Sequence, residues 1–176
     1  SKPRRSEAFQ DLSTLAIVLS VLILIFVFVA RIVIVSGASM EDTLHNGNAM
    51  LVWSLGYKPK QGDIVVLTQT TYQDDSIVKR VIATGGQTVD IDYGTGTVYV
   101  DGTALKEDYI KERMEVPHYG EGLNHITVPE GCIFVMGDNR NNSADSRYPA
   151  IGIVDERSVI GHVLLVLFPF SAFGTR

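Results

Sequence analysis

Two different hydrophobic patterns divide the chain. Residues 16–35 read AIVLSVLILIFVFVARIVIV, and the stretch from Leu15 to Ala30 contains no charged residue, glycine or proline. At 1.5 Å per residue, a helix from about Leu12 to Ile34 reaches roughly 30 Å, the thickness of the hydrocarbon core of a bilayer. No polar stripe recurs at helical spacing, which disfavours a helix buried in a soluble core. The pattern predicts a transmembrane helix over residues 12–35, preceded by a tail of residues 1–11.

After this segment, short apolar or alternating runs are separated by Gly, Pro, Asp and Asn, a spacing typical of an all-β domain. The Asp101-Gly102 pair between two such runs is a hairpin-turn signal. We therefore expect an all-β domain of mixed, mostly antiparallel sheets over residues 36–176. Residues 106–125 are highly charged and weakly patterned, which favours either a surface loop or a short helix. The predicted strands are Met50–Trp53, Asp63–Leu67, Ile77–Ala83, Thr88–Ile91, Thr97–Val100, Thr103–Leu105, Ile126–Val128, Cys132–Met136 and Val159–Phe168.

Charge around the apolar segment predicts its orientation. Lys2, Arg4 and Arg5 precede it, whereas Arg31 is the only cation near its far end, so the N-terminus is expected in the cytoplasm and residues 36–176 outside. A cleavable signal peptide is the alternative, and the small residues SGAS after Val35 leave it open. Because the chain begins with Ser rather than Met, we also expect it to be trimmed or incomplete at that end.

Composition narrows the possible functions of residues 36–176. Their net charge is −7, and an acidic domain is a poor binder of nucleic acid. The single Cys132 lies in the apolar run CIFVM, where a small buried hydrophobe is the expected role, and one cysteine cannot form an internal disulfide. A domain that depends on its core instead of disulfides is compatible with a bacterial cell surface.

The alternating run IVKRVI places two adjacent cations on opposite faces of one predicted strand. Lys79 shares a face with Ile77 and Val81, so either Lys79 or Arg80 must point toward an apolar surface or an edge. One interpretation is an edge strand protected from aggregation by its lysine. The other is a desolvated Lys79 that loses its proton near neutral pH and serves as general base for a serine, such as Ser39 in SGASMEDTL.

A second polar concentration, GDNRNNSADSR, covers residues 137–147 directly after the strand Cys132–Met136. It is either a hydrated loop or a hydrogen-bonded network that fixes a site. It does not fit a calcium loop, because Arg140 would occupy a ligand position and no glutamate closes the loop. The four histidines lack zinc-site spacing and Ser39 is not in a G-x-S-x-G motif, so no metal or cofactor is expected. A Ser-His-Asp triad stays open, since triads assemble in space.

These three stretches resemble the motifs of the type I signal peptidases. The serine motif S-M-x-P-T-L is similar to residues 39–44, SMEDTL; the motif K-R-V-I matches residues 79–82; and G-D-N-x-x-x-S-x-D-S-R matches residues 137–147. The ending FPFSAFG and the short 106–125 insertion are similar to the Gram-positive form of the family. The motifs occur in the family's order behind an apolar segment, and the resemblance covers nearly the whole chain.

The resemblance implies a role for each motif residue. Ser39 is the expected nucleophile and Lys79 the general base, and the backbone N–H of Ser39 is expected to donate to the oxyanion. Some members carry a second donor, a serine hydroxyl, where this chain has Gly37. Asp42 replaces the family's proline, and it either loosens the turn behind Ser39 or places near Lys79 a carboxylate that raises its pKa. The implied supporting residues are Ser143, as a hydrogen-bond partner of the lysine amine, the ion pair of Asp145 and Arg147, and Gly137 and Asp138. The implied walls of the substrate pocket are Met40, Leu44 and Val78.

The implied activity is a membrane-anchored endopeptidase that removes signal peptides from exported preproteins, cutting after small residues at positions −1 and −3. Its expected partners are preprotein signal peptides and the lipid bilayer. Keeping Lys79 neutral at pH 7 costs on the order of 4 kcal/mol, and a serine four residues past the span would lie near the headgroups, which would help to desolvate the lysine. The alternative is a non-catalytic relative that binds or presents substrates for surface assembly. The apolar segment and the absence of a DNA-binding segment exclude a soluble Ser-Lys repressor.

Overall fold

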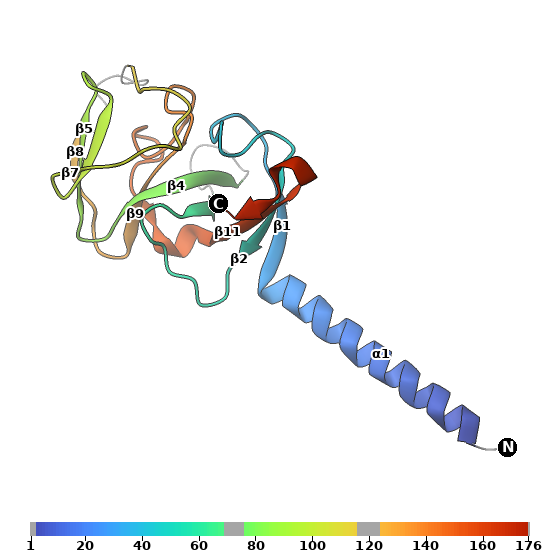
Figure 1. Cartoon of the computed structure of the whole chain (residues 1–176). Coiled ribbons are helices and arrows are strands. Elements are labelled where there is room, and N and C mark those ends of the chain that lie inside the picture. The colour runs from blue at the N-terminus through green and yellow to red at the C-terminus, as the bar shows by residue number, and fades with distance from the viewer. Residues whose placement is uncertain (1–2, 69–75, 116–123, 176) are drawn as a thin grey trace.

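The computed structural model describes residues 3–68, 76–115 and 124–175. Helix α1 (Pro3–Phe28) projects from a β-rich domain that contains the rest of the described chain (Figure 1). Its stretch Glu7–Phe26 is long and apolar enough to cross a membrane and has no buried residue. The predicted fold class, a mostly antiparallel β domain behind one apolar helix, is confirmed.

The helix ends seven residues before the predicted end of the span at residue 35. The helix ends at Phe28, and strand β1 (Ala30–Ile34) pairs antiparallel with β2 (Ala49–Trp53) in five register pairs. The run IVIV explains the change, because β-branched side chains fit a pleated strand better than a helix. Arg31, expected at the end of the span, is instead an exposed residue of β1.

All nine predicted strands are present, each within two residues of its expected bounds. The large sheet has the order β1-β2-β11-β3-β4-β9-β10, with β12 paired to β11, and the small sheet has the order β7-β6-β5-β8; every described pair is antiparallel. The remaining bounds are β3 Ile64–Leu67, β4 Ile77–Thr84, β5 Thr88–Asp92, β6 Thr97–Val100, β7 Thr103–Ala104, β8 His125–Thr127, β9 Cys132–Met136, β10 Val154–Asp155, β11 Val159–Phe168 and β12 Gly174–Thr175. Two 3-10 turns, Glu156–Ser158 and Phe170–Ala172, flank β11.

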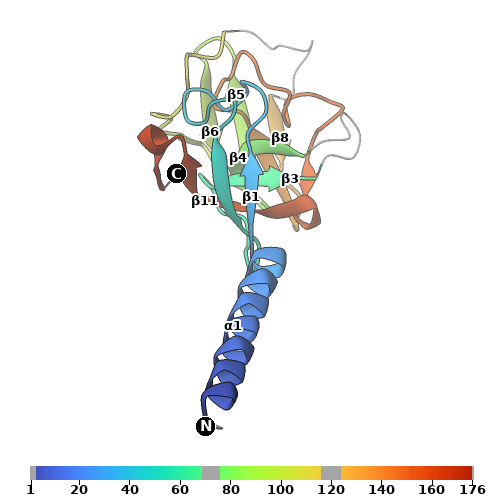
Figure 2. The same cartoon turned by 90° about the vertical axis from the view of Figure 1, so that its right-hand side faces the viewer.

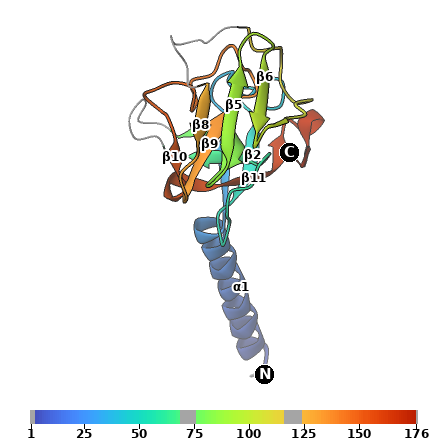
Figure 3. The ribbon, with the colours of Figure 1, turned by 90° about the vertical axis from the view of Figure 1, so that its left-hand side faces the viewer.

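The two sheets meet over a shared core. Residues of β4 and β9, among them Ile82 and Phe134, pack against Val89 and Val98 of the small sheet, which covers this part of the large one (Figure 3). A second core, which includes Met50 and Val163, packs against β2 and β11 of the large sheet. A third core cluster, which includes Val81 and Val135, also packs on β4 and β9.

The turn signals and the charged insertion have different outcomes. Asp101 and Gly102 both have positive φ, as the predicted hairpin turn between β6 and β7 requires. Residues 106–115 contain no helix, and Met114 is fully buried, so this described part is more than a surface loop. Residues 116–123 of the predicted insertion lie outside the described residues. Cys132 is only partly buried, at the margin of the core.

Candidate active site

Ser39 lies in the turn that follows β1, and the 137–147 loop fixes its backbone. The Asn139 backbone N–H donates to the Ser39 carbonyl over 3.0 Å, and the Asn139 side-chain amide donates to the Ala38 carbonyl over 3.0 Å. The two bonds join segments 100 residues apart in the sequence. Asn139 was not among the predicted site residues, and it holds the serine turn in place.

Strand β4 brings Lys79 to this serine. The Lys79 Nζ lies 2.8 Å from Ser39 Oγ and donates a second bond to its neighbour, the Val78 carbonyl, over 2.9 Å. Lys79 is 3% exposed and forms no ion pair among the described residues. Because the Lys79 side chain is buried and not exposed at a sheet edge, the edge-blocking interpretation is wrong and the predicted desolvation of Lys79 is present.

Burial lowers the pKa of Lys79 to about 8. The nearby carboxylates of Asp145 and Asp138 act in the opposite direction, and the Arg147 guanidinium adds to the lowering. Desolvation is the largest of these effects, as expected for an amine that is enclosed without a paired carboxylate. A substantial fraction of Lys79 is therefore neutral slightly above neutral pH.

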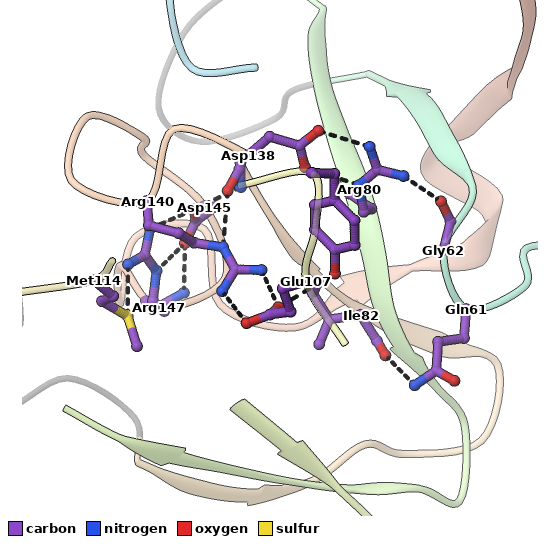
Figure 4. Close-up of polar contacts among 12 residues, drawn as sticks. Gln61, Gly62, Arg80, Ile82, Glu107, Met114, Asp138, Arg140, Asp145 and Arg147 are labelled. Atoms are coloured by element: carbon purple, nitrogen blue, oxygen red, sulfur yellow. Dashed lines mark hydrogen bonds and ion pairs between the residues drawn. The ribbon is translucent and has the colours of Figure 1, made fainter. Parts of the chain in front are cut away.

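The adjacent Arg80 is also buried, but unlike Lys79 its charged group is paired with a carboxylate. Its guanidinium forms two bonds to Asp138, of 2.8 and 2.7 Å, and a third to the Gly62 carbonyl of 2.7 Å (Figure 4). It also lies 4.0 Å from the ring centre of Tyr109. Asp138 accepts a further bond from Thr43 of the serine turn over 2.5 Å. This pair joins the lysine strand, the 137–147 loop and the serine turn.

The predicted Asp145–Arg147 ion pair is present, with two bonds of 2.8 Å. Burial opposes ionisation of Asp145, but Arg147 and the Gly137 backbone N–H, 2.9 Å away, hold the pKa of Asp145 below its usual value. Gly137 is required for close packing: a Cβ there would lie 2.2 Å from Ser143 Oγ and 2.4 Å from the Ser39 carbonyl oxygen. The 137–147 segment is thus a hydrogen-bonded network, and the hydrated-loop interpretation is wrong.

The expected hydrogen bond between Ser143 and Lys79 is absent. Ser143 Oγ is buried and makes no hydrogen bond to Lys79; its hydroxyl instead helps to lower the pKa of Asp145. The Lys79 amine donates to Ser39 and Val78. The Val78 carbonyl therefore accepts a bond from the amine where Ser143 was expected to do so.

One buried pair in the network was not predicted. Arg140 is 1% exposed, and its guanidinium pairs with Glu107 from the 106–115 segment (Figure 4). The partners are 33 residues apart, and sequence pattern gave no signal for their contact.

A groove with a volume of about 340 Å³ passes over Ser39 and Lys79. Its walls come from the end of β1, the serine turn, the start of β4 and three residues near the loop, Asn142, Ala144 and Ile151. Met40 and Val78 line it as predicted, but Leu44 does not, because it is fully buried in the core below. No histidine is among the described residues that line it.

Two further predictions can be compared with the structure. Asp42 is exposed, and it is not among the charges that shift the pKa of Lys79, so the second of its two possible effects is not seen. Ser39 follows β1 and not the helix, and in Figure 2 the arrow of β1 points away from α1. Five residues of strand rise roughly 15 Å. Protein atoms alone leave Lys79 only 3% exposed, so its burial does not require the headgroups.

The described domain thus combines a mostly antiparallel β fold with a buried lysine that contacts a serine in an open groove. Residues 9–168 match the family model described as "Signal peptidase, peptidase S26". The chain belongs to this signal peptidase family, as the motif resemblance predicted.

Comparisons with individual proteins agree with this family assignment. The chain is 38% identical to a probable signal peptidase I-1 of Synechocystis sp., over 94% of this chain and 85% of that protein. It is 34% identical to signal peptidase I of Bacillus licheniformis, over 97% and 94%. The crystal structure of a signal peptidase I from Enterococcus faecalis V583 is similar with a TM-score of 0.50 and 34% identity, covering 60% of this chain and 97% of that chain.

Proposed function

We propose that this chain is a membrane-anchored serine endopeptidase that removes signal peptides from exported preproteins, with Ser39 as nucleophile and Lys79 as general base. The observation that carries the proposal is the buried Lys79 amine 2.8 Å from Ser39 Oγ, with its pKa lowered to about 8. The relatives named signal peptidase I support the substrate class.

In this mechanism, neutral Lys79 accepts the Ser39 hydroxyl proton as Oγ attacks the carbonyl of the scissile peptide bond. The lysine then gives that proton to the leaving amine as the C–N bond breaks, which leaves an ester on Ser39. Lys79 next takes a proton from water as the water attacks the ester, and returns it to Ser39 Oγ. We assign Ser143 Oγ, which is buried behind Gly137, as an acceptor for the ammonium formed on Lys79 in these steps, while its hydroxyl hydrogen points to Asp145.

The oxyanion would be stabilised by the Ser39 backbone N–H, which has no acceptor among the described residues. The corresponding N–H of Gly37 already donates to the Asn46 side chain over 3.1 Å. Gly37 has no hydroxyl, so we expect the Ser39 N–H to act without a side-chain donor at position 37.

The groove fits an extended peptide. β1 pairs only with β2, and Ile77 and Val78 of β4 pair only with β3, so both groove walls have unpaired backbone edges among the described strands. A substrate strand between them would gain backbone hydrogen bonds, while its alternate side chains enter shallow pockets beside Met40 and Val78. Small residues at positions −1 and −3 follow from this mode.

The helix provides the anchor. With α1 in the bilayer and Lys2, Arg4 and Arg5 on the cytoplasmic side, residues after Phe28 lie on the extracytoplasmic side. A signal peptide lying beside α1 would leave the bilayer next to β1 and follow that strand to Ser39.

The test is cleavage of a preprotein by the purified full chain, with the new N-terminus mapped by mass spectrometry. We expect one cut after small residues at −1 and −3, no cut by Ser39→Ala, and a strong loss when −1 is changed to leucine. A non-catalytic substrate-binding relative would leave the preprotein intact with both the wild type and Ser39→Ala. That outcome would reject the proposal, as would efficient cleavage of the leucine substrate.

A further inference from the structure

The connection between β2 and β3, residues 54–63, lies beside the end of helix α1. The Val29 carbonyl, one residue past the helix, accepts bonds from the Ser54 backbone N–H over 3.0 Å and from the Ser54 hydroxyl over 3.2 Å. All three overall views show this connection on the side of the domain that faces α1 (Figures 1, 2 and 3). If α1 crosses the bilayer, this connection lies at the depth of the headgroups.

A pocket of about 420 Å³ opens within this connection. Its lining combines aromatic, apolar and cationic side chains, including Trp53, Leu55, Tyr57, Lys58, Lys60 and Asp63. Leu55 is 61% exposed at its rim, and the Trp53 indole N–H is oriented by a 2.8 Å bond to the Leu55 carbonyl. Tyr57 is fixed from behind by stacking on His162, with ring centres 4.2 Å apart. Exposed leucine beside tryptophan and lysine is the composition that proteins place at membrane–water interfaces.

The charges of the pocket favour an anion. The Asp63 carboxylate is already bound by the Tyr57 hydroxyl over 2.7 Å and by the Lys60 backbone N–H over 3.2 Å. Lys58 and Lys60 are exposed, and their amines form no ion pair among the described residues. Two ammonium groups are therefore available above an exposed apolar rim, an arrangement complementary to a phosphate attached to acyl chains.

We infer that this pocket binds the headgroup of an anionic phospholipid of the bilayer that holds α1. The lysines contact the phosphate, and Leu55 and Trp53 contact the upper acyl chains. This contact gives the β domain a second attachment beside α1 and fixes its rotation about the helix axis, so that the groove stays in register with a substrate emerging from the same bilayer. The inference rests on the proposed membrane anchoring.

Trp53 is the only tryptophan in the chain, which gives the pocket its own fluorescence signal. The experiment places the full chain in phosphatidylcholine vesicles containing phosphatidylglycerol, with bromine on the upper acyl chain of either lipid. We expect Trp53 to be quenched more strongly by brominated phosphatidylglycerol, with a preference of roughly fivefold per lysine. Lys58→Gln and Lys60→Gln, singly and together, should remove the preference stepwise. Lys106→Gln, an equal charge change at an exposed lysine on the connection after β7, should not.

The outcomes separate this inference from the anchoring on which it rests. Equal quenching by the two brominated lipids would overturn the headgroup pocket while leaving the anchor intact. No quenching by either lipid would show that this end of the domain is not at the bilayer, and would overturn both. A preference that persists in the double lysine variant would also overturn the inference, because these lysines would then not be its source.

Discussion

Buried cations occur in two arrangements around the groove. Arg80, Arg140 and Arg147 are each nearly inaccessible, and each forms an ion pair, with Asp138, Glu107 and Asp145 respectively. Lys79 is equally buried but has only a hydroxyl and a carbonyl as partners. A buried charge without a counter-ion is costly, and an amine relieves that cost by losing its proton.

This difference separates cations that are fixed by ion pairs from the one that can change its charge. The guanidinium group stays charged at any working pH and forms paired bonds with carboxylates, so the arginines suit a permanent framework. Lysine changes its charge when it is desolvated, so it suits proton transfer. The two neighbours on β4, Lys79 and Arg80, have these two arrangements side by side.

The largest expected effect on cleavage comes from replacing Lys79 by arginine, the residue type of its neighbour Arg80. Lys79→Arg keeps a positive charge that cannot accept a proton from Ser39, so cleavage should fall at least roughly 10⁴-fold, to the level of Ser39→Ala. Lys106→Arg, at an exposed lysine paired with Asp108, is the matched control and should cleave normally. Appreciable preprotein cleavage by Lys79→Arg would show that a permanently charged residue can replace Lys79, and would contradict the contrast drawn between Lys79 and Arg80.

Removing a framework partner should affect folding. Asp138→Ala leaves the buried Arg80 without its carboxylate and Thr43 without its acceptor, so the free energy of unfolding should fall by about 3–5 kcal/mol. Denaturant melts give this value. Asp155→Ala breaks the exposed pair with Arg157 and should change stability little. Similar losses in the two variants would mean that burial does not determine how much each ion pair contributes to the free energy of unfolding.

Removing the buried Lys79 amine should instead raise the free energy of unfolding at neutral pH. The pKa of Lys79 is about 8 in the folded chain and about 10.5 in the unfolded one, so between these values the unfolded state binds more protons and wild-type stability from this group rises with pH. Below pH 8 the buried amine lowers the free energy of unfolding by roughly 3 kcal/mol, and above pH 10.5 this penalty is gone. Lys79→Met should lack this rise and should be the more stable protein at pH 7. Parallel pH dependence of the two melts would contradict the lowered pKa.

The smallest effect is expected at Ser143. If its hydroxyl accepts a bond from the ammonium formed during catalysis, Ser143→Ala should lower kcat about 10- to 100-fold with little change in KM. A packing role alone would lower stability and leave the pH profile of cleavage in place, whereas loss of the acceptor should move it. Wild-type kcat in this variant would leave Val78 as the sole partner that orients Lys79.

Sequence pattern located nearly all of the β domain because each strand is a short apolar run between turn residues. It missed β1 because ARIVI continues an apolar segment without a break, and only pairing with β2 distinguishes strand from span. It missed β10 and β12 because two-residue strands have no periodicity.

For the site, alternation along IVKRVI showed that one cation had to be buried, and motif resemblance indicated Lys79. The structure buries both, because Asp138 reaches Arg80 from 58 residues away. Such long-range partners, including Asn139 on Ser39 and Glu107 on Arg140, depend on how the loops pack over the sheet, which no local pattern encodes.

The central claim is that neutral Lys79 is the base, and the pH dependence of kcat/KM for preprotein cleavage tests it most directly. Below the pKa of the free enzyme's base, kcat/KM should rise tenfold per pH unit, and it should level off above about pH 8, where burial places the pKa of Lys79. A curve that is already level by about pH 6.5, the ordinary pKa of histidine, or one that keeps rising to about 10.4, that of an exposed lysine, would contradict the account.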